Sequence, residues 1–367
     1  MDKITWITAN CFLDVDIPII TEISKYYNID WYIYIQKENE INYLPLINKV
    51  SRTNLTKQII YLKNRIRNPF LLYEYINSIY KIKKSKANIY YIDLTGAPYF
   101  LPLFKFIIGD KKTTIAIHNI STPKGAINSR LANIYTNYCI KAFKNIHVFS
   151  NSQKRILEKK QKNKNILLAP LALKDFGKIS ISNKESIEKK IEFLSFGYIR
   201  TYKRIDVLIE AAQLAYEATK IPFLVKIAGS CNDWDIYQKK IKYNFLFELK
   251  ITSIPNEEIA EIFSTANYFV LPYQDIAQSG AITVALNYNV PVIASNLEAF
   301  REIIKDKDTG FLFKAASIKD LKEIIIYILK NHKEIYPQLK LRQKIYVEEH
   351  YSNQVIAQKY LNFFNQL

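Results

Sequence analysis

The stretch that decides the fold runs from Ile191 to Ala211 and reads IEFLSFGYIRTYKRIDVLIEA. Its first residues are typical of a strand, and this predicted strand ends at Gly197. Two cations, Arg200 and Lys203, follow the glycine, and an amphipathic helix is predicted to begin near Ile205. The free amides of a helix N-terminus attract anions, and the two cations add to that attraction. The stretch therefore predicts a strand, a loop and a helix that together bind an anionic group.

The same alternation of strand and helix extends through the chain on both sides of this stretch. Because parallel strands are joined by helical crossovers, it predicts α/β domains of the doubly wound, Rossmann-like kind, with helices on both faces of parallel sheets. A chain of 367 residues also favours two domains over one. The predicted strands are 4–9, 31–35, 89–95, 113–118, 145–150 and 166–169 in the first half, and 191–197, 223–229, 247–253, 268–272, 291–295 and 310–313 in the second.

A polar stretch in the middle of the chain marks the domain boundary. Residues 174–190 are polar and lack periodicity, so they predict a linker. This linker separates an N-terminal domain, 1–173, from a C-terminal domain, 191–350. The last segment, 351–367, contains an amphipathic stretch, and we expect it to form a helix that packs back on the N-terminal domain.

Two further strand ends in the second half carry residues suited to phosphate. The run Gln278-Ser279-Gly280 follows a predicted strand and opens a predicted helix, with Thr283 one turn further on. Glu302 lies in a third segment, ahead of Gly310. In doubly wound domains, ligands bind at the carboxyl ends of the strands, where loops lead into helix N-termini. The first-turn amides of the predicted helix are therefore expected to hold a diphosphate.

The order of these motifs resembles glycosyltransferase family 4. The motifs are FGxIRxYKxID from Phe196, PY followed by QSG from Pro272, PVIAS from Pro291, and a glutamate separated from a glycine by seven residues, from Glu302. Members of that family are retaining enzymes of the GT-B fold, in which two Rossmann-like domains face each other across a cleft, and they use nucleotide-activated sugars. The resemblance thus implies a transferase that moves a sugar from a nucleotide diphosphate sugar to an acceptor hydroxyl.

The resemblance also implies roles for individual residues. Arg200 and Lys203 would stabilise the charge of the leaving diphosphate, and Glu302 would lie near the ribose or the sugar. The leaving phosphate oxygen would take the acceptor proton, so neither a protein base, nor a metal, nor another cofactor is expected. The expected donor-binding residues are Gly197, Arg200, Lys203, Gln278, Ser279, Gly280, Thr283 and Glu302.

In the first half, the resemblance points to two strand ends. His118 closes the predicted strand 113–118, similar to a histidine that lies near the transferred sugar in the family, and we expect it to act in catalysis with Arg200 and Lys203. Asn119, next to it, is expected on the acceptor side. Asp14 and Asp16 follow the first strand, where a carboxylate would orient an acceptor hydroxyl.

One departure from the family pattern leaves two alternatives open. Many members carry a pair of glutamates before the strand that resembles PVIAS, whereas this chain has Ile276 and Val284 at those positions. The Gln-Ser-Gly form resembles a subgroup that lacks the pair. One alternative is a catalytically degenerate nucleotide-sugar-binding protein. The other is a metal-dependent transferase of the GT-A type, because an Asp-x-Asp triplet binds a metal in that fold and this chain has two, Asp14-Val15-Asp16 and Asp233-Trp234-Asp235.

Charge divides the chain unevenly. Residues 1–173 hold 26 Lys and Arg against 11 Asp and Glu, a net charge of +15, whereas residues 174–367 hold 26 against 23, a net charge of +3. Residues 57–86 mix basic and apolar side chains, which predicts one or two basic amphipathic helices broken near Pro69. Such helices suit an anionic membrane surface, and an ordinary solvated face is the alternative. No nucleic-acid-binding motif accompanies the charge, so no nucleic acid partner is expected.

Composition indicates a cytoplasmic protein. Cys11, Cys139 and Cys231 are far apart and form no CxxC pair, which is typical of a reducing compartment. The residues after Met1 enter a predicted strand without the features of a signal peptide, and no segment reaches the roughly 20 apolar residues of a bilayer span. We expect an enzyme on the inner face of the plasma membrane that takes a UDP- or GDP-linked sugar and a saccharide or lipid-linked acceptor, in surface polysaccharide synthesis.

Overall fold

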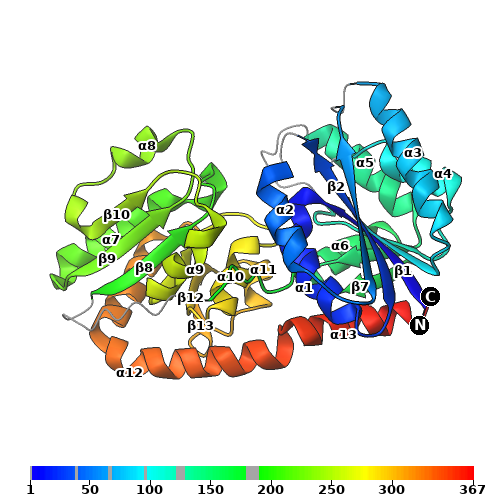
Figure 1. The fold of residues 1–367 in the computed structure, drawn as a ribbon. Helices are drawn as coiled ribbons and strands as arrows, with labels where there is room; N and C mark the ends of the chain where they lie inside the picture. Colours follow the sequence, from blue (N-terminus) through cyan, green and yellow to red (C-terminus); the bar gives the residue numbers. More distant parts are fainter. Residues whose placement is uncertain (1, 38–39, 65–67, 95–96, 121–128, 179–189) are drawn as a thin grey trace. The chain divides into compact units, whose positions relative to one another are not determined.

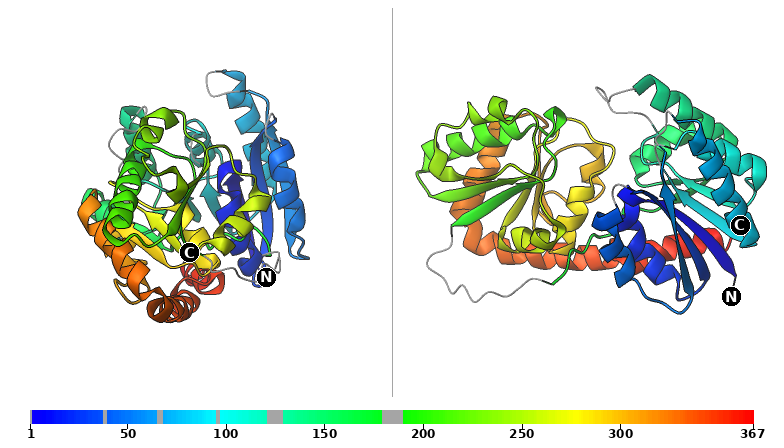
Figure 2. Two further views of the ribbon diagram at one scale, coloured as in Figure 1. Left: turned by 90° about the vertical axis from the view of Figure 1, so that its left-hand side faces the viewer. Right: turned by 45° about the horizontal axis from the view of Figure 1, so that its top comes forward.

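Two parallel sheets organise the protein (Figure 1). The structure, a computed structural model, describes residues 2–37, 40–64, 68–94, 97–120, 129–178 and 190–367. The chain divides into two compact units: unit 1 comprises Met1–Ala172 and Tyr351–Leu367, and unit 2 comprises Leu173–His350. Within each unit, helices cover both faces of a sheet (Figure 2). These observations confirm the predicted doubly wound α/β architecture.

Unit 1 contains a seven-stranded parallel sheet in the order β3-β2-β1-β4-β5-β6-β7. Its strands are β1 (Lys3–Ala9), β2 (Asn28–Gln36), β3 (Leu55–Leu62), β4 (Ile89–Asp93), β5 (Thr113–Ala116), β6 (Asn145–Val148) and β7 (Asn165–Leu168). Its helices are η1 (Asn10–Phe12), α1 (Leu13–Ile23), α2 (Glu40–Lys49), α3 (Phe70–Lys84), α4 (Phe100–Ile107), α5 (Ser129–Ala142), α6 (Asn151–Lys160) and α13 (Asn353–Phe364).

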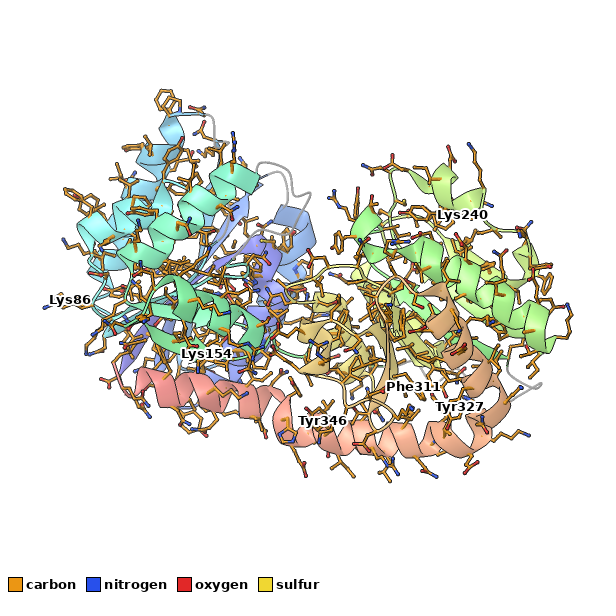
Figure 3. The ribbon with its side chains drawn as sticks, turned by 180° about the vertical axis from the view of Figure 1, so that it is seen from behind. Lys86, Lys154, Lys240, Phe311, Tyr327 and Tyr346 are labelled. Atoms are coloured by element: carbon orange, nitrogen blue, oxygen red, sulfur yellow. The ribbon has the colours of Figure 1, made fainter. Side chains whose placement is uncertain are left out.

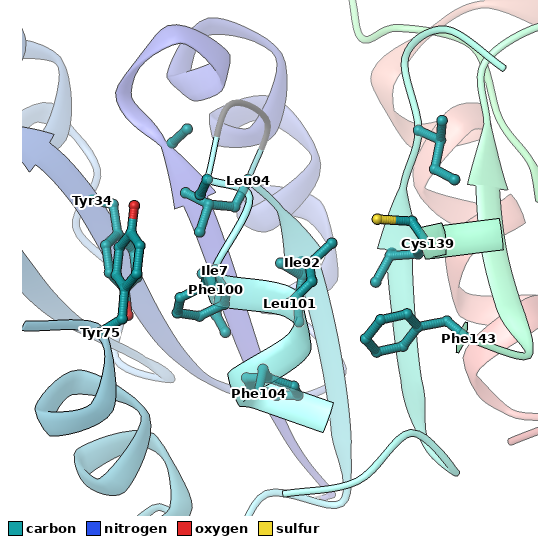
Figure 4. Packing of buried hydrophobic residues seen from close by; sticks show 14 of the residues in the cluster. Ile7, Tyr34, Tyr75, Ile92, Leu94, Phe100, Leu101, Phe104, Cys139 and Phe143 are labelled. Carbon is teal, nitrogen blue, oxygen red and sulfur yellow. The ribbon is translucent and has the colours of Figure 1, made fainter. Parts of the chain in front are cut away.

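The side chains of β1 alternate between two hydrophobic cores, one on each face of this sheet. Ile7 packs in a cluster with Phe100 and Phe104 of α4, shown in Figure 4. Trp6 packs in the other cluster, with Tyr360 of α13. Because successive side chains of a strand point to opposite faces, one apolar strand stabilises both layers of helices. Helix α13 contacts α1 and β7 of unit 1.

One predicted element in unit 1 is wrong. Residues 57–86 were expected to form basic amphipathic helices, but Leu55–Leu62 is strand β3, which pairs in parallel with β2. The sequence TKQIIYL in this strand contains β-branched and aromatic residues, and these favour a strand over a helix. The second part of the expectation is confirmed, because α3 begins at Phe70, directly after Pro69.

Unit 2 contains a six-stranded parallel sheet in the order β10-β9-β8-β11-β12-β13. Its strands are β8 (Ile191–Phe196), β9 (Phe223–Ala228), β10 (Phe247–Lys250), β11 (Tyr268–Leu271), β12 (Val292–Ser295) and β13 (Gly310–Phe313). Its helices are η3 (Thr201–Lys203), α7 (Ile205–Thr219), α8 (Trp234–Gln238), η4 (Asn244–Leu246), α9 (Asn256–Thr265), α10 (Gly280–Asn287), α11 (Glu298–Arg301) and α12 (Ile318–His350). The strand order reverses between β8 and β11, which is where doubly wound sheets bind ligands.

The predicted linker falls largely outside the described residues. Of 174–190, the structure describes 174–178 and 190, and these belong to unit 2. The described part contacts α10 through Tyr288, whose hydroxyl accepts a hydrogen bond from the amide of Phe176 at 2.9 Å. Among the described residues, no helix has the length and apolarity that crossing a bilayer needs.

Candidate functional site

The loop after β8 is closed by two glycines that touch. Gly197 has φ +102°, and its amide donates to the carbonyl of Ala228 at 2.9 Å. Gly229, at the end of β9, has φ +147°, and a Cβ added there would lie 2.3 Å from the carbonyl oxygen of Gly197. The positive φ favours glycine at both positions, and at Gly229 the close approach of the Gly197 backbone also leaves no room for a side chain. The two glycines bring the ends of β8 and β9 together.

Lys203 occupies the space in front of Gly197. Its Nζ lies 3.3 Å from the position that a Cβ on Gly197 would take, and 5.4 Å from the ring centre of Tyr273. Burial, together with the positive charge of Arg200, lowers the pKa of Lys203 to about 8. Within the described parts of the chain, no carboxylate forms an ion pair with Lys203 or Arg200. A buried ammonium beside a second cation is an arrangement that an anion would stabilise.

Arg200 is more exposed than Lys203. It lies at the N-terminal end of η3, with its guanidinium 4.5 Å from the ring centre of Tyr198. Arg204 ends η3 in the left-handed region, with φ +49°, and its guanidinium donates to both carboxylate oxygens of Asp206. That tight turn sets the direction in which α7 leaves the loop.

The QSG run lies where the sequence predicts it, at the start of α10. Ser279 is the N-cap residue, but its side chain accepts no capping hydrogen bond from the first turn. Burial raises the pKa of Tyr273, and the nearby Ser279 hydroxyl opposes that shift. Gly280 is the first helical residue, and the buried hydroxyl of Thr283 donates to its carbonyl at 2.8 Å. Gln278, in the loop just before Ser279, is half-buried.

These contacts join part of the predicted donor site. Gly197, Lys203, Tyr273, Ser279 and Gly280 form a continuous group at the ends of β8 and β11. Glu302 directly follows α11 and is half-buried, with its amide donating to the carbonyl of Glu298 at 3.2 Å.

Three residues in or next to this group were not selected from the sequence. Tyr273 belongs to the PY motif, but the sequence gives no sign that its ring faces Lys203. The contact in the structure shows it. Gly229 offered one signal, a glycine at a strand end in a chain with only 8 glycines. Lys174 lies in the predicted linker, yet its Nζ is 3.1 Å from the position of a Cβ on Gly280.

A pocket of about 290 Å³ opens beside the loop after β8. Tyr198, Arg200 and Arg204 line it from that loop, and Cys231 and Lys240 line it from the segment after β9. Lys240 is labelled in Figure 3 and pairs with Glu210 of α7, with 2.6 Å between Nζ and Oε1. The loop that carries Arg200 therefore has an open hollow on this side.

In unit 1, His118 is held from three sides. Its Nε2 lies 2.9 Å from Oδ1 of Asp93, the last residue of β4. Its ring stacks on Phe12 at 4.0 Å and on Phe149 at 4.3 Å between ring centres. Asp93 and the histidine are both buried. The end of β4 and the segments after β1, β5 and β6 therefore fix the orientation of one imidazole, which is the arrangement of a preorganised functional group.

The predicted acceptor-side residues have different surroundings. Asp16 lies in α1 and is buried; its Oδ2 accepts hydrogen bonds from Trp6 Nε1 at 3.0 Å and Thr8 Oγ1 at 2.6 Å. Burial, and then the charge of Asp93, raise the pKa of Asp16 well above its usual range. Asp14 is half-buried in the same helix, and Asn119 is exposed. The surroundings of Asp16 thus suit a structural carboxyl, and Asp14 and Asn119 are the more accessible of the three.

The two Asp-x-Asp triplets differ in their surroundings. Asp233 and Asp235 lie at the start of α8 in unit 2, and Asp14 and Asp16 lie in α1. In the part of the chain that the structure describes, no three His, Cys, Asp or Glu residues group closely enough to hold a metal ion.

The sequence and the fold were compared with those of known proteins. Residues 178–346 match the family described as glycosyl transferases group 1, and this range lies inside unit 2. The search of curated proteins finds no significant match.

Solved structures share the whole fold. A glycosyltransferase from Rickettsia africae has a TM-score of 0.74 at 14% identity, and the match covers 100% of this chain and 98% of that one. Anabaena HepE, solved with UDP and glucose, has a TM-score of 0.74 at 12% identity, with 100% of both chains covered. S. aureus TarM, solved in a complex that includes UDP, has a TM-score of 0.73 at 14% identity, also with 100% of both chains covered. Unit 2 thus matches the family model, and the chain has the GT-B fold of these solved structures.

Proposed function

We propose that the protein is a retaining glycosyltransferase of family 4 that moves a sugar from a nucleotide diphosphate sugar to an acceptor hydroxyl. The observation that carries the proposal is Lys203, a buried cation at the β8 loop that pairs with no described carboxylate. Arg200 adds a second positive charge to that loop, and α10 adds the amides of a helix start. Support also comes from HepE, which was solved with UDP and glucose. UDP- and GDP-linked sugars are the proposed donors.

In the proposed reaction, the bond between the anomeric carbon and the donor phosphate oxygen breaks while the acceptor oxygen bonds to the same face of that carbon. The acceptor proton passes to the leaving phosphate oxygen, so the chain supplies no base and needs no metal. Charge grows on the diphosphate as the bond breaks. Lys203, Arg200 and the first amides of α10 would stabilise this charge from fixed positions, which lowers the barrier.

In unit 1, His118 is the residue we assign to the transferred sugar. Asp93 positions it, because the hydrogen bond to Nε2 and the two stacked phenyl rings leave the imidazole one orientation. Asp14 and Asn119 are the proposed acceptor-side residues. Glu302 remains the proposed contact to the ribose or sugar.

The test is a panel of UDP, GDP, ADP and their common sugars, read first by thermal shift and then by sugar transfer or hydrolysis. We expect at least one nucleoside diphosphate to raise the melting temperature and its sugar to be turned over in the presence of excess EDTA. Binding without turnover would favour the degenerate binding protein. Turnover that EDTA abolishes and Mn²⁺ or Mg²⁺ restores would favour the metal-dependent alternative.

The acceptor is proposed to be a saccharide or lipid-linked saccharide at the inner face of the plasma membrane, reached by a cytoplasmic enzyme through unit 1. Helices α3, α4 and α5 lie together in unit 1 (Figure 1). Helix α4 packs against α3. The hydroxyl of Tyr135 on α5 donates a hydrogen bond to the carbonyl of Ala97, just before α4. Phe106 on α4 is 89% exposed and Phe70 on α3 is 70% exposed. The last turn of α3 carries three lysines: Lys81, Lys83 and Lys84. Neighbouring helices that carry exposed rings and lysines suit the boundary of an anionic bilayer.

Vesicle co-sedimentation tests this surface. We expect binding to vesicles with anionic lipid, little binding to neutral vesicles, and partial release at 1 M salt, where the Debye length falls to about 3 Å. Phe106→Ser should weaken the fraction that salt does not release, whereas Tyr327→Ser, an exposed ring of α12, should not. Equal binding to both kinds of vesicle, or none, would assign the lysines to an ordinary solvated surface.

A further inference from the structure

The first residues of unit 2, 173–178, contact helix α10 at both of its ends. At the C-terminal end of the helix, the hydroxyl of Tyr288 accepts from the amide of Phe176 at 2.9 Å and lies 3.0 Å from the carbonyl of Gly177, to which it donates. Burial raises the pKa of Tyr288 to about 12, so the phenol keeps its proton at neutral pH. Gly177 takes φ +113°, which turns the chain at this point. We call residues 173–178 the strap.

At the other end of α10, the strap places an ammonium group on the first turn. The Nζ of Lys174 lies 3.1 Å, and its Cε 3.5 Å, from the position that a Cβ on Gly280 would take. Gly280 is the first residue of α10. Because this residue has no side chain, the lysine can approach the backbone of the helix start closely. The strap thus spans the helix, with Lys174 at its N-terminus and the Tyr288 contact just after its C-terminus.

This placement has an electrostatic consequence. The N-terminus of a helix carries positive partial charge, so a lysine at that end is disfavoured relative to one at the C-terminal end. The same helix start adjoins Ser279 and Tyr273, and the ring of Tyr273 faces Lys203. Positive charge is thereby gathered from three elements: the strap, the β8 loop and α10. A ligand with negative charge on two adjacent groups suits such a cluster of positive charge, and a diphosphate has that form.

We propose that Lys174 is a third cation of the donor site, binding the diphosphate, and that Tyr288 is a positioning residue that holds the strap in register. The inference rests on the proposed function and deepens it, because it adds a residue from outside the family motifs. Lys174 acts on the ligand, whereas Tyr288 acts only through the strap.

The experiment is calorimetric titration of the full chain with UDP, GDP, ADP and inorganic pyrophosphate. Lys174→Met should weaken the binding of the preferred diphosphate by roughly 10- to 100-fold, the range for one lost charge-assisted hydrogen bond. Lys174→Arg should stay close to the wild type. The matched control is Lys178→Met, which removes an exposed lysine from the same strap. Tyr288→Phe should weaken binding several-fold without removing a charge.

The outcomes separate this inference from the proposed function. If the wild type binds no nucleoside diphosphate or pyrophosphate, the donor site itself is wrong. If the wild type binds a diphosphate and Lys174→Met binds it as tightly as the wild type does, the donor site stands and the role of Lys174 is overturned. Equal weakening by the two lysine variants would also overturn it, because the effect would then be one of general charge. Wild-type affinity in Tyr288→Phe would remove the positioning role.

Discussion

The two units share one architecture but place their functional groups in different ways. In unit 2, short loops closed by glycines carry cations to strand ends, and the net charge of residues 174–367 is only +3. In unit 1, the candidate group is a buried histidine that stacks on two phenyl rings and bonds to a buried aspartate, and the net charge of residues 1–173 is +15. The proposed donor site in unit 2 is thus defined by local backbone motifs, and the candidate group of unit 1 by contacts between distant strands. The following predictions test that contrast.

The largest effect is expected at Lys203. Lys203→Ala should lower kcat/KM for the donor by about 100- to 1,000-fold, with a fall in kcat as well as a rise in KM, because the lost charge acts most strongly in the transition state. Steady-state kinetics with varied donor would measure it. Lys226→Ala is the control, since that lysine of β9 is already paired with Glu248 at 2.9 Å. A Lys203→Ala enzyme with wild-type constants would show that unit 2 does not use its loop cations.

The next effect concerns the glycine contact that closes the β8 loop. Gly229→Ala should destabilise the protein by about 3 kcal/mol, because the new Cβ would meet the carbonyl oxygen of Gly197 and the residue would keep a left-handed backbone. Thermal unfolding would measure the loss. Gly109→Ala is the matched control, since Gly109 also has positive φ but no atom within 4 Å of its Cβ position. Equal losses in the two variants would mean that backbone strain alone, and not the contact between loops, is responsible.

A smaller effect is expected in unit 1, where Asp93 positions His118. Asp93→Asn should lower kcat by about tenfold with little change in donor KM, because the asparagine retains shape but weakens the bond to Nε2. Asp30→Asn is the control, since Asp30 is also largely buried and pairs with Lys3 at 2.7 Å. If the two variants lose activity in parallel with their melting temperatures, Asp93 is structural.

The mildest effect is a pH dependence of donor binding. Lys203 has a pKa of about 8, lowered by burial and then by Arg200, so its charge is present below pH 8 and is lost as the pH rises above it. Affinity for a nucleoside diphosphate should therefore be constant up to about pH 7.5 and fall by several-fold by pH 9. Lys203→Arg should remove this fall, because guanidinium does not titrate there. A fall that persists in Lys203→Arg would assign the pH dependence to another group.

The sequence predicted the local features of both units better than the contacts between elements. The β8 strand, Gly197 and the start of α7 all lie where the pattern placed them, because each depends on neighbouring residues. The strand β3 was missed because the basic residues of the stretch 57–86 suggested helices, whereas pairing with β2 stabilises a strand. Asp93 was missed because a lone strand-end aspartate carries no motif. The sequence did select His118, but its hydrogen bond to Asp93 becomes visible only when β4 and β5 pair. Lys174 was missed because a polar segment without periodicity gives no sign that it packs on α10.

The most direct test of the central claim is a titration of the full chain with nucleoside diphosphates and the matching monophosphates at pH 7. Unit 2 is expected to bind at least one diphosphate about tenfold more tightly than its monophosphate, because Lys203 and the start of α10 bind the additional phosphate. Lys203→Met should remove most of that preference. If no diphosphate binds, or if the same preference persists in Lys203→Met, the assignment of the donor site to these residues is wrong.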